Sequence, residues 1–166
     1  MTPEAELQRL MDNHLISRLK ATYVRLVDEK SWSSLERLLA DDFAFNGTHD
    51  GHEFVDLTRR SLADASTVHQ LGVGELEVES PTTATGVWPF ADIIDQRRDG
   101  LGAYRRGFGH YHETYVKASS GWRIAAMRII RLRVECTVIV SGGEVRNRTC
   151  LSQEEVVAWL DQQSRL

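Results

Sequence analysis

The chain has 166 residues, which is enough for one domain with a substantial hydrophobic core. Its hydrophobic fraction of 42% and charged fraction of 27% are ordinary for a globular protein. The formal net charge of −4 argues against a nucleic-acid-binding surface, which is usually basic.

The chain also lacks the marks of a membrane or secreted protein. No apolar run approaches the roughly 18 residues of a membrane span, and the charged N-terminus has no signal-peptide pattern. The two cysteines, Cys136 and Cys150, form at most one disulfide and lack the spacing of metal ligands. We therefore expect a cytoplasmic protein with reduced thiols and with neither a nucleic-acid nor a membrane partner.

The first predicted element is a helix over about residues 3–28. Thr2 followed by Pro3 is typical of a helix start. Apolar residues at three-to-four spacing predict a buried face made of Leu7, Leu10, Met11, Leu15, Leu19, Val24 and Val27. Tyr23 and Asp28 lie near the end of this helix, about 140° apart around its axis. One apolar stripe does not explain both positions.

Further elements follow in chain order. "SWSSLERLLAD" predicts a short second helix, "FAF" a brief strand, and "DGHEFVDLTRRSLADA" a third helix. Asp50 and Glu53 have the spacing of a capping box at the start of that third helix.

The second half of the chain reads as strands. "TVHQLGVGELEVES" predicts one long strand with a bulge or bend, because its apolar alternation slips near Gly72 and Gly74. "TTATGVWPFADIID" predicts the next strand and "QRRDG" a turn. Two long strands, 104–118 and 121–138, form a hairpin. A helix over about residues 152–164, with Ser152 and Glu155 as a capping box, ends the chain.

This order predicts an α+β fold in a single domain spanning residues 1–166. Long antiparallel strands curl, and the early helices cover the concave side of the sheet. We expect a cone-like, antiparallel or mixed sheet that encloses a pocket, with Tyr23 and Asp28 at the pocket wall.

His69 and Asp28 are candidates for a catalytic pair. A histidine in an apolar strand is commonly a hydrogen-bonded core residue, and an aspartate at a helix end is commonly solvated. If a carboxylate binds one ring nitrogen, however, the histidine becomes a base near neutral pH. Asp28 is a candidate for that carboxylate.

Asp92 continues an aromatic row in "GVWPFADII". Strand alternation places Trp88, Phe90 and Asp92 on one face. A buried carboxylate is costly unless it is paired. The alternative is that the strand ends here and that Asp92 is hydrated.

Other candidates are histidines and arginines on the last two long strands. His110 and His112, two residues apart, would make half of a metal site, but no further ligand cluster supports one. The arginines that crowd the last strand, which could equally form a solvated face, are Arg123, Arg128, Arg131 and Arg133. Neither a glycine-rich phosphate loop nor a GxSxG motif occurs. We therefore expect no metal and no organic cofactor.

Three segments together resemble a known family. They are "YVRLVDEKSWSSLERLL", "VHQLGVGELEVESPTTATGVWPFAD" and "GHYHETYVKASSGWRIAAMRIIRLRV". In order and spacing they resemble the bile acid 7-alpha-dehydratase family over residues 5–135. This family lies in the SnoaL-like, scytalone dehydratase-related branch of the nuclear transport factor 2-like superfamily. The resemblance implies five catalytic positions, which fall on Tyr23, Asp28, His69, Asp92 and Arg131.

The resemblance also implies a function. We expect a cofactor-independent dehydratase or lyase, or a proton-transfer isomerase, acting on a hydrophobic carbonyl-activated substrate such as a steroid or polyketide. The alternative is a module of the same fold that binds small ligands or proteins without catalysis. A homo-oligomer is expected, a trimer by resemblance, with a dimer left open.

Substrate contacts are expected from Trp88, Phe90, His110 and Arg128. Strand alternation places Arg128 and Arg131 on opposite faces, so the choice of Arg131 rests on the resemblance. As aligned, the bile acid enzyme has no histidine on the strand of His110, whereas scytalone dehydratase has one. We therefore expect a different substrate from that of the bile acid enzyme.

Overall fold

The computed structural model describes residues 2–47, 50–98, 101–139 and 143–163. The elements in chain order are α1 (Pro3–Asp28), α2 (Trp32–Glu36), β1 (Leu39–Phe45), α3 (Gly51–Leu62), β2 (Ala65–Leu71), β3 (Glu75–Val78), β4 (Thr83–Arg98), β5 (Leu101–Ala118), β6 (Gly121–Ile139), β7 (Val145–Cys150) and α4 (Gln153–Gln163).

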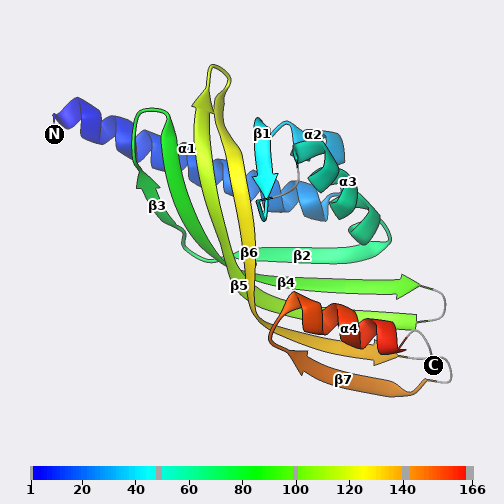
Figure 1. Cartoon of the computed structure of the whole chain (residues 1–166). Coiled ribbons are helices and arrows are strands. Elements are labelled where there is room, and N and C mark those ends of the chain that lie inside the picture. Colours follow the sequence, from blue (N-terminus) through cyan, green and yellow to red (C-terminus); the bar gives the residue numbers. More distant parts are fainter. Residues whose placement is uncertain (1, 48–49, 99–100, 140–142, 164–166) are drawn as a thin grey trace.

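The strands form one mixed sheet in the order β1-β6-β5-β4-β2, with β3 also paired to β4 and β7 to β6. Only β1 pairs in parallel, and it does so with β6, among the strands of the described ranges. The long strands β4, β5 and β6 bend midway, so that α1 lies against one half of the sheet and α4 against the other (Figure 1). The predicted α+β class, with a curved sheet and N-terminal helices, is confirmed.

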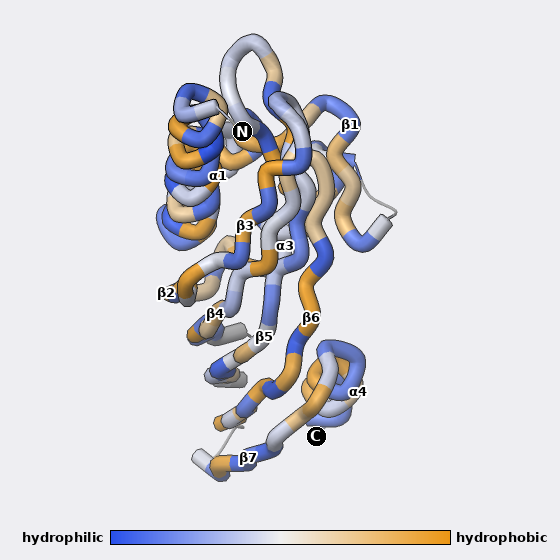
Figure 2. Tube along the Cα trace, turned by 90° about the vertical axis from the view of Figure 1, so that its left-hand side faces the viewer, coloured by the Kyte–Doolittle hydropathy of each residue, from blue (hydrophilic) through white to orange (hydrophobic). Residues whose placement is uncertain are grey.

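Helix α1 begins as predicted, but its predicted buried face is wrong in the first half. The hydroxyl of Thr2 accepts a hydrogen bond from the backbone N–H of Ala5, with Pro3 in the first turn. Four residues of the predicted buried face are 42–62% exposed to solvent. They are Leu7, Leu10, Met11 and Leu15. Polar Asp12 and Lys20 face the sheet instead, because partners on the strands satisfy them. Figure 2 shows hydrophilic and hydrophobic residues mixed along the helix.

The segment predicted as one bulged strand is divided into β2 and β3, which both pair with β4. The break lies at Gly72–Gly74, where the chain passes close to Trp88. A Cβ atom on Gly74 would lie 2.4 Å from the indole ring of Trp88, so this approach requires glycine. The sequence pattern also missed β7.

The predicted turn after β4 and the predicted end of α4 lie partly outside the described residues. Strand β4 continues to Arg98, into the predicted "QRRDG" turn, and the last two turn residues, 99 and 100, lie outside the described part. Helix α4 is described to Gln163, and residue 164 of the prediction lies outside it.

Two register shifts in the β5–β6 pairing change which residues of β6 face inward. One lies opposite Thr114 and Tyr115, and the other opposite Phe108 and Gly109. The inward residues are Trp122 and Ile124 before the first shift, Met127, Ile129 and Arg131 between the shifts, and Val134, Cys136 and Val138 after the second. Each shift acts as a β-bulge, which exchanges the two faces of a strand.

The core has two parts. The larger hydrophobic cluster lies between the early helices and the sheet. A smaller cluster seats α4 on β6 and β7, and it contains the free thiols of Cys136 and Cys150. None of the described helices is long and apolar enough to cross a membrane.

Candidate active site

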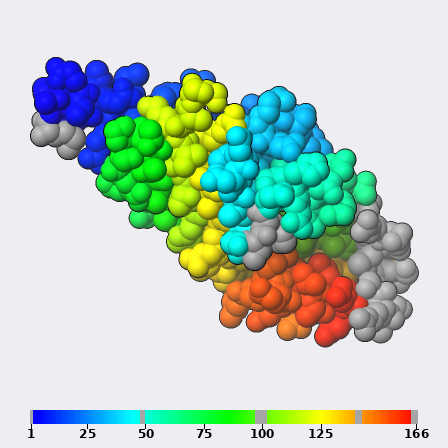
Figure 3. Space-filling model, turned by 45° about the horizontal axis from the view of Figure 1, so that its top comes forward, coloured from blue at the N-terminus to red at the C-terminus, as the bar shows by residue number. Residues whose placement is uncertain are grey.

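A cavity of about 780 Å³ lies between α1, α3, α4 and the inner face of the sheet. Helices α3 (teal) and α4 (red) lie next to each other on one face of the molecule in Figure 3. The polar residues that line the cavity are Tyr23, Asn46, Thr58, Arg60, Ser61, His69, Asp92, Gln96, Arg105, Tyr111, Arg131, Ser152, Gln153 and Glu154.

The structure brings Asp28 and His69 together at the cavity wall. Oδ1 of Asp28 lies 2.7 Å from Nδ1 of His69, and Oδ2 accepts a 2.8 Å hydrogen bond from the backbone N–H of His69. The His69 side chain is 8% exposed and that of Asp28 is 25% exposed. No described residue hydrogen-bonds Nε2 of His69, so Nε2 is available to a ligand. A carboxylate at Nδ1 favours the tautomer in which Nε2 is the base.

Residues beside the helix end hold Asp28 in place. The hydroxyl of Thr67 donates to Oδ1 of Asp28 at 2.8 Å, and it accepts from Nζ of Lys30 at 2.6 Å. Lys30 follows the helix with a φ of 58°, a left-handed conformation that turns the chain away from the helix axis. The end of α1 and strand β2 are thus joined around this carboxylate.

Asp92 and Arg131 form a buried two-pronged ion pair. The N···O distances are 3.1 Å and 2.6 Å, and the side chain of Asp92 is only 2% exposed. In the sheet register Asp92 lies beside His69 on one side and beside Gly107 on the other. A Cβ atom on Gly107 would lie 2.0 Å from Nη1 of Arg131 and 2.2 Å from Oδ1 of Asp92. The ion pair therefore occupies the space that a side chain at Gly107 would fill.

Two tyrosines face the same cavity. Tyr23 is 4% exposed, and its hydroxyl contacts Sδ of Met127 at 3.6 Å. Its ring packs edge-on against Tyr111, whose centroid lies 6.2 Å away. Burial raises the pKa of Tyr23 and of Tyr111 well above the ordinary value of 10.0, so both remain hydrogen-bond donors near neutral pH.

Of the residues expected to contact substrate, Trp88 and Phe90 lie behind the cavity wall. The indole N–H of Trp88 donates to the hydroxyl of Tyr115 at 2.7 Å. The ring of Phe90 packs on Tyr111 with a centroid distance of 4.5 Å, and the Arg131 guanidinium lies 5.4 Å from its centre. Both residues support the wall rather than line the cavity.

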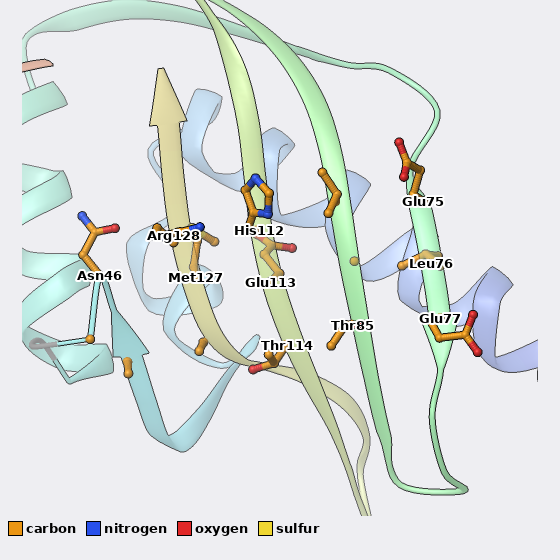
Figure 4. A pocket seen from close by; sticks show the side chains of 15 residues that line it. Asn46, Glu75, Leu76, Glu77, Thr85, His112, Glu113, Thr114, Met127 and Arg128 are labelled. Carbon is orange, nitrogen blue, oxygen red and sulfur yellow. The ribbon is translucent and has the colours of Figure 1, made fainter. Parts of the chain in front are cut away.

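The structure does not bring His110 or Arg128 to this cavity. Because Tyr111 points inward, its neighbours His110 and His112 point to the opposite face of the sheet. Figure 4 shows His112 and Arg128 side by side on neighbouring strands, where they line a separate hollow of about 800 Å³ with α1 behind the sheet. His110 and Arg128 could therefore contact only a molecule bound on the outer face of the sheet, not one in this cavity.

A buried ion pair lies beneath α1, deeper than the catalytic candidates. Nζ of Lys20 donates to Glu113 at 2.5 Å, and both side chains are fully buried. Tyr115 also donates to Glu113, and Lys20 lies 3.4 Å from the centroid of the Tyr111 ring. Burial lowers the pKa of Lys20, which the charge of Glu113 opposes. Alternation places Glu113 on the face of Tyr111, but no sequence pattern predicted its pairing with Lys20.

Arg105 was also missed, although it lines the cavity. The alternation of β5 places it with Gly107, Gly109 and Tyr111. This alternation is visible in the sequence, and it would have pointed to Arg105.

No described group of three or more His, Cys, Asp and Glu side chains is arranged to hold a metal ion. The side chains that are present offer a histidine base, a hydrogen-bond donor and an oriented ion pair around one cavity. These groups can transfer a proton and stabilise negative charge on an oxygen.

Comparison with known proteins gives one matching family and several related folds. Residues 8–128 match the family described as the SnoaL-like domain. The probable cyclase FGR4 of Gibberella zeae is 23% identical over 137 residues, which are 71% of this chain and 89% of that protein.

Solved structures resemble the fold at low sequence identity. A scytalone dehydratase-like protein from Novosphingobium aromaticivorans superposes with a TM-score of 0.67 and 17% identity, over 76% of this chain and 88% of that one. A type 2 hexachlorocyclohexane dehydrochlorinase (LinA) superposes with a TM-score of 0.69 and 16% identity, over 86% and 93% of the two chains.

Proposed function

Because this chain belongs to the SnoaL-like domain family, we propose that it is a cofactor-independent lyase that eliminates water or a similar leaving group. The substrate is a hydrophobic, carbonyl-activated molecule such as a steroid or polyketide. Relatives whose names denote a cyclase, a scytalone dehydratase and a dehydrochlorinase support lyase-type chemistry. An isomerase that uses the same proton transfers is the nearest variant.

The observation that carries the proposal is the contact between Asp28 and His69 at the wall of the cavity. Nε2 of His69 removes a proton from the carbon next to the substrate carbonyl. Asp28 orients the ring and stabilises the imidazolium that forms. The phenol of Tyr23 donates a hydrogen bond to the enolate oxygen.

Elimination is completed at the neighbouring carbon. The bond from that carbon to its hydroxyl breaks as the double bond forms, and the proton from His69 passes to the leaving hydroxide, which departs as water. The base is regenerated without a redox step. The Asp92–Arg131 pair, which lies beside His69 in the register, holds the leaving group or the carbonyl.

The first experiment is a turnover screen with 3-oxo-4-ene steroids and hydroxylated aromatic polyketides. With an active substrate, His69→Ala is expected to lower the rate by about 10² to 10⁴, the usual contribution of a general base. Asp28→Asn is expected to lose a large factor as well, and the double variant to be little worse than His69→Ala, because the pair acts as a unit. Exposed His52→Ala is the control.

If His69→Ala retains the wild-type rate, the mechanism is wrong. Tight binding of these compounds without turnover by the wild-type protein would favour the alternative of a non-catalytic binding module.

We also propose that the chain forms a homo-oligomer, with a trimer as the first expectation. The exposed apolar row of α1, which comprises Leu7, Leu10, Met11 and Leu15, supports an assembled state, because large exposed apolar patches mark interaction surfaces. Light scattering after size-exclusion chromatography tests this, and a monomer at high protein concentration would contradict it.

A further inference from the structure

Arg105 is a positive charge that lines the cavity and has no partner among the residues that the structure describes. Its Nε is buried and lacks a hydrogen-bond partner. No hydrogen bond or ion pair joins its guanidinium to any other residue in the described part of the chain. The Arg105 side chain as a whole is partly buried, but a buried donor such as its Nε is rarely left without a hydrogen-bond partner, so this arrangement is unusual in a resting protein.

The charges around Arg105 leave it uncompensated. Of the interior carboxylates, Asp92 is engaged by Arg131 and Asp28 by His69. At the rim, Arg60 pairs with Asp56 at 3.4 Å, and Glu154 is exposed in the first turn of α4. Burial, and next the charge of Arg131, lower the pKa of Arg105, while Cys136 and Asp92 act in the opposite direction. Arg105 is thus a guanidinium of the cavity that no described carboxylate pairs with.

The position of Arg105 relative to the catalytic candidates is set by the sheet. Arg105 pairs with Ile94 on β4, and Gly107 pairs with Asp92. Two residues along a strand span about 7 Å, so Arg105 lies one side-chain row beyond the Asp92–Arg131 pair, towards α4. The N-terminal turn of α4, from Ser152 to Glu154, lines the same cavity.

We propose that Arg105 binds a carboxylate on the substrate, so that the cavity accepts hydrophobic acids rather than neutral molecules. A guanidinium fork matches a carboxylate with two parallel hydrogen bonds, and one unpaired guanidinium matches a monoanion. This assignment deepens the proposed function, since it defines which end of the substrate lies near α4 when the reacting carbon faces His69.

The test compares matched acids and amides by calorimetric titration. The probes are 3-oxo-4-androstene-17β-carboxylate with its 17β-carboxamide, and 1-naphthylacetate with 1-naphthylacetamide. Wild-type protein is expected to bind at least one acid about tenfold or more tightly than its amide. In Arg105→Met this ratio is expected to fall to between about one and two, because only the acid loses its ion pair. The amide is expected to retain its affinity.

Arg106→Met is the control, because Arg106 is the next residue on β5 but lies on the outer face, where it pairs with Glu135 at 3.8 Å. It is expected to keep the full preference for the acid. Loss of the preference in Arg131→Met but not in Arg105→Met would overturn the proposal. So would a wild-type protein that binds neither acid or that shows no preference.

Folding and turnover are separated in this design. Since Arg105 has no partner among the described residues to lose, Arg105→Met is expected to melt at the wild-type temperature or above it. A drop of several degrees would assign Arg105 to the fold instead. If the protein prefers the acids but turns over no substrate, the role of Arg105 stands and the proposed function is wrong. If the protein turns over neutral substrates and shows no preference for acids, the proposed function stands and the role of Arg105 is wrong.

Discussion

Gly107 shows how one missing side chain shapes the candidate site. The Asp92–Arg131 pair lies over its Cα, in the volume that a methyl group would occupy. The residue is glycine for reasons of space, since the backbone at this position is ordinary β-strand.

Gly107→Ala is therefore expected to displace the ion pair. Breaking a buried ion pair costs about 3–5 kcal/mol, so we expect a loss of unfolding free energy of that order and a matching loss of turnover. Denaturant unfolding and the rate with an active substrate are the measurements.

Gly102→Ala on the same strand is the matched control. A Cβ atom there would lie 3.6 Å from the Cβ of Ile139, an ordinary contact, and its effect is expected to stay within about 1 kcal/mol. Equal stability of the two variants would show that the ion pair moves aside without cost.

At the scale of elements, the ion pair between Lys20 and Glu113 ties α1 to β5. Lys20→Met leaves the carboxylate of Glu113 buried, with Tyr115 as its one remaining donor among the described residues. We expect the unfolding free energy to fall by about 3–5 kcal/mol. Adding Glu113→Gln removes the unpaired charge, so the double variant is expected to recover part of this loss.

Arg25→Met is the comparison on the same helix. Its ion pair with Glu29 is half exposed, and such pairs contribute about 0–1 kcal/mol. If Lys20→Met cost no more than Arg25→Met, the buried pair would have no role in fixing α1 on the sheet.

The elements differ in how far the sequence could predict them. Helix α1 was readable from its cap at Thr2 and Pro3, and β4 from unbroken alternation through Trp88, Phe90 and Asp92. Strand β6 was predicted over 121–138, but its inward face was not, because two bulges exchange that face twice and no local residue pattern indicates them. Alternation alone did not decide whether Arg128 or Arg131 faces the cavity. The register with β5 decides it, because Arg131 lies opposite Gly109 and Arg128 opposite His112.

Long-range partners explain the other misses. The exposed apolar row of α1 looked like a core face because the sequence does not reveal that Asp12 and Lys20 meet Trp122 and Glu113 on the sheet. Asp28 and His69 are 41 residues apart, so no local rule predicts their contact. Their residue types suggested the pair, and the family resemblance supported it. Strand β7 is short and polar, and only its pairing with β6 defines it.

At the scale of the whole molecule, buried tyrosines link stability to high pH. Burial raises the pKa of Tyr23, Tyr111 and Tyr115 above the ordinary value of 10.0. The folded protein keeps these protons where the unfolded chain loses them. Their contribution to stability is therefore complete below pH 10 and declines as the pH rises above it.

Above pH 10.5 the unfolding free energy is expected to fall by about 1.4 kcal/mol per pH unit for each tyrosine, or about 4 kcal/mol for the three. Urea titrations at pH 9.5, 10.5 and 11 measure this slope. Tyr111→Phe should reduce it by about one third, since the hydroxyl of Tyr111 makes no hydrogen bond to another described residue. A slope unchanged by Tyr111→Phe would show that other groups control alkaline unfolding.

The small hydrophobic cluster beneath α4 has a kinetic consequence. It holds β7 and α4 with far fewer buried side chains than the main core holds α1. A segment with few buried contacts opens at a lower free energy than the whole protein, so we expect α4 to detach with its own frequency. Because the start of α4 lines the cavity, we expect that frequency to limit how long a bound molecule stays there. The rate at which an alkylating reagent modifies the buried thiols of Cys136 and Cys150 measures this frequency, because the reagent reaches them only while the segment is open.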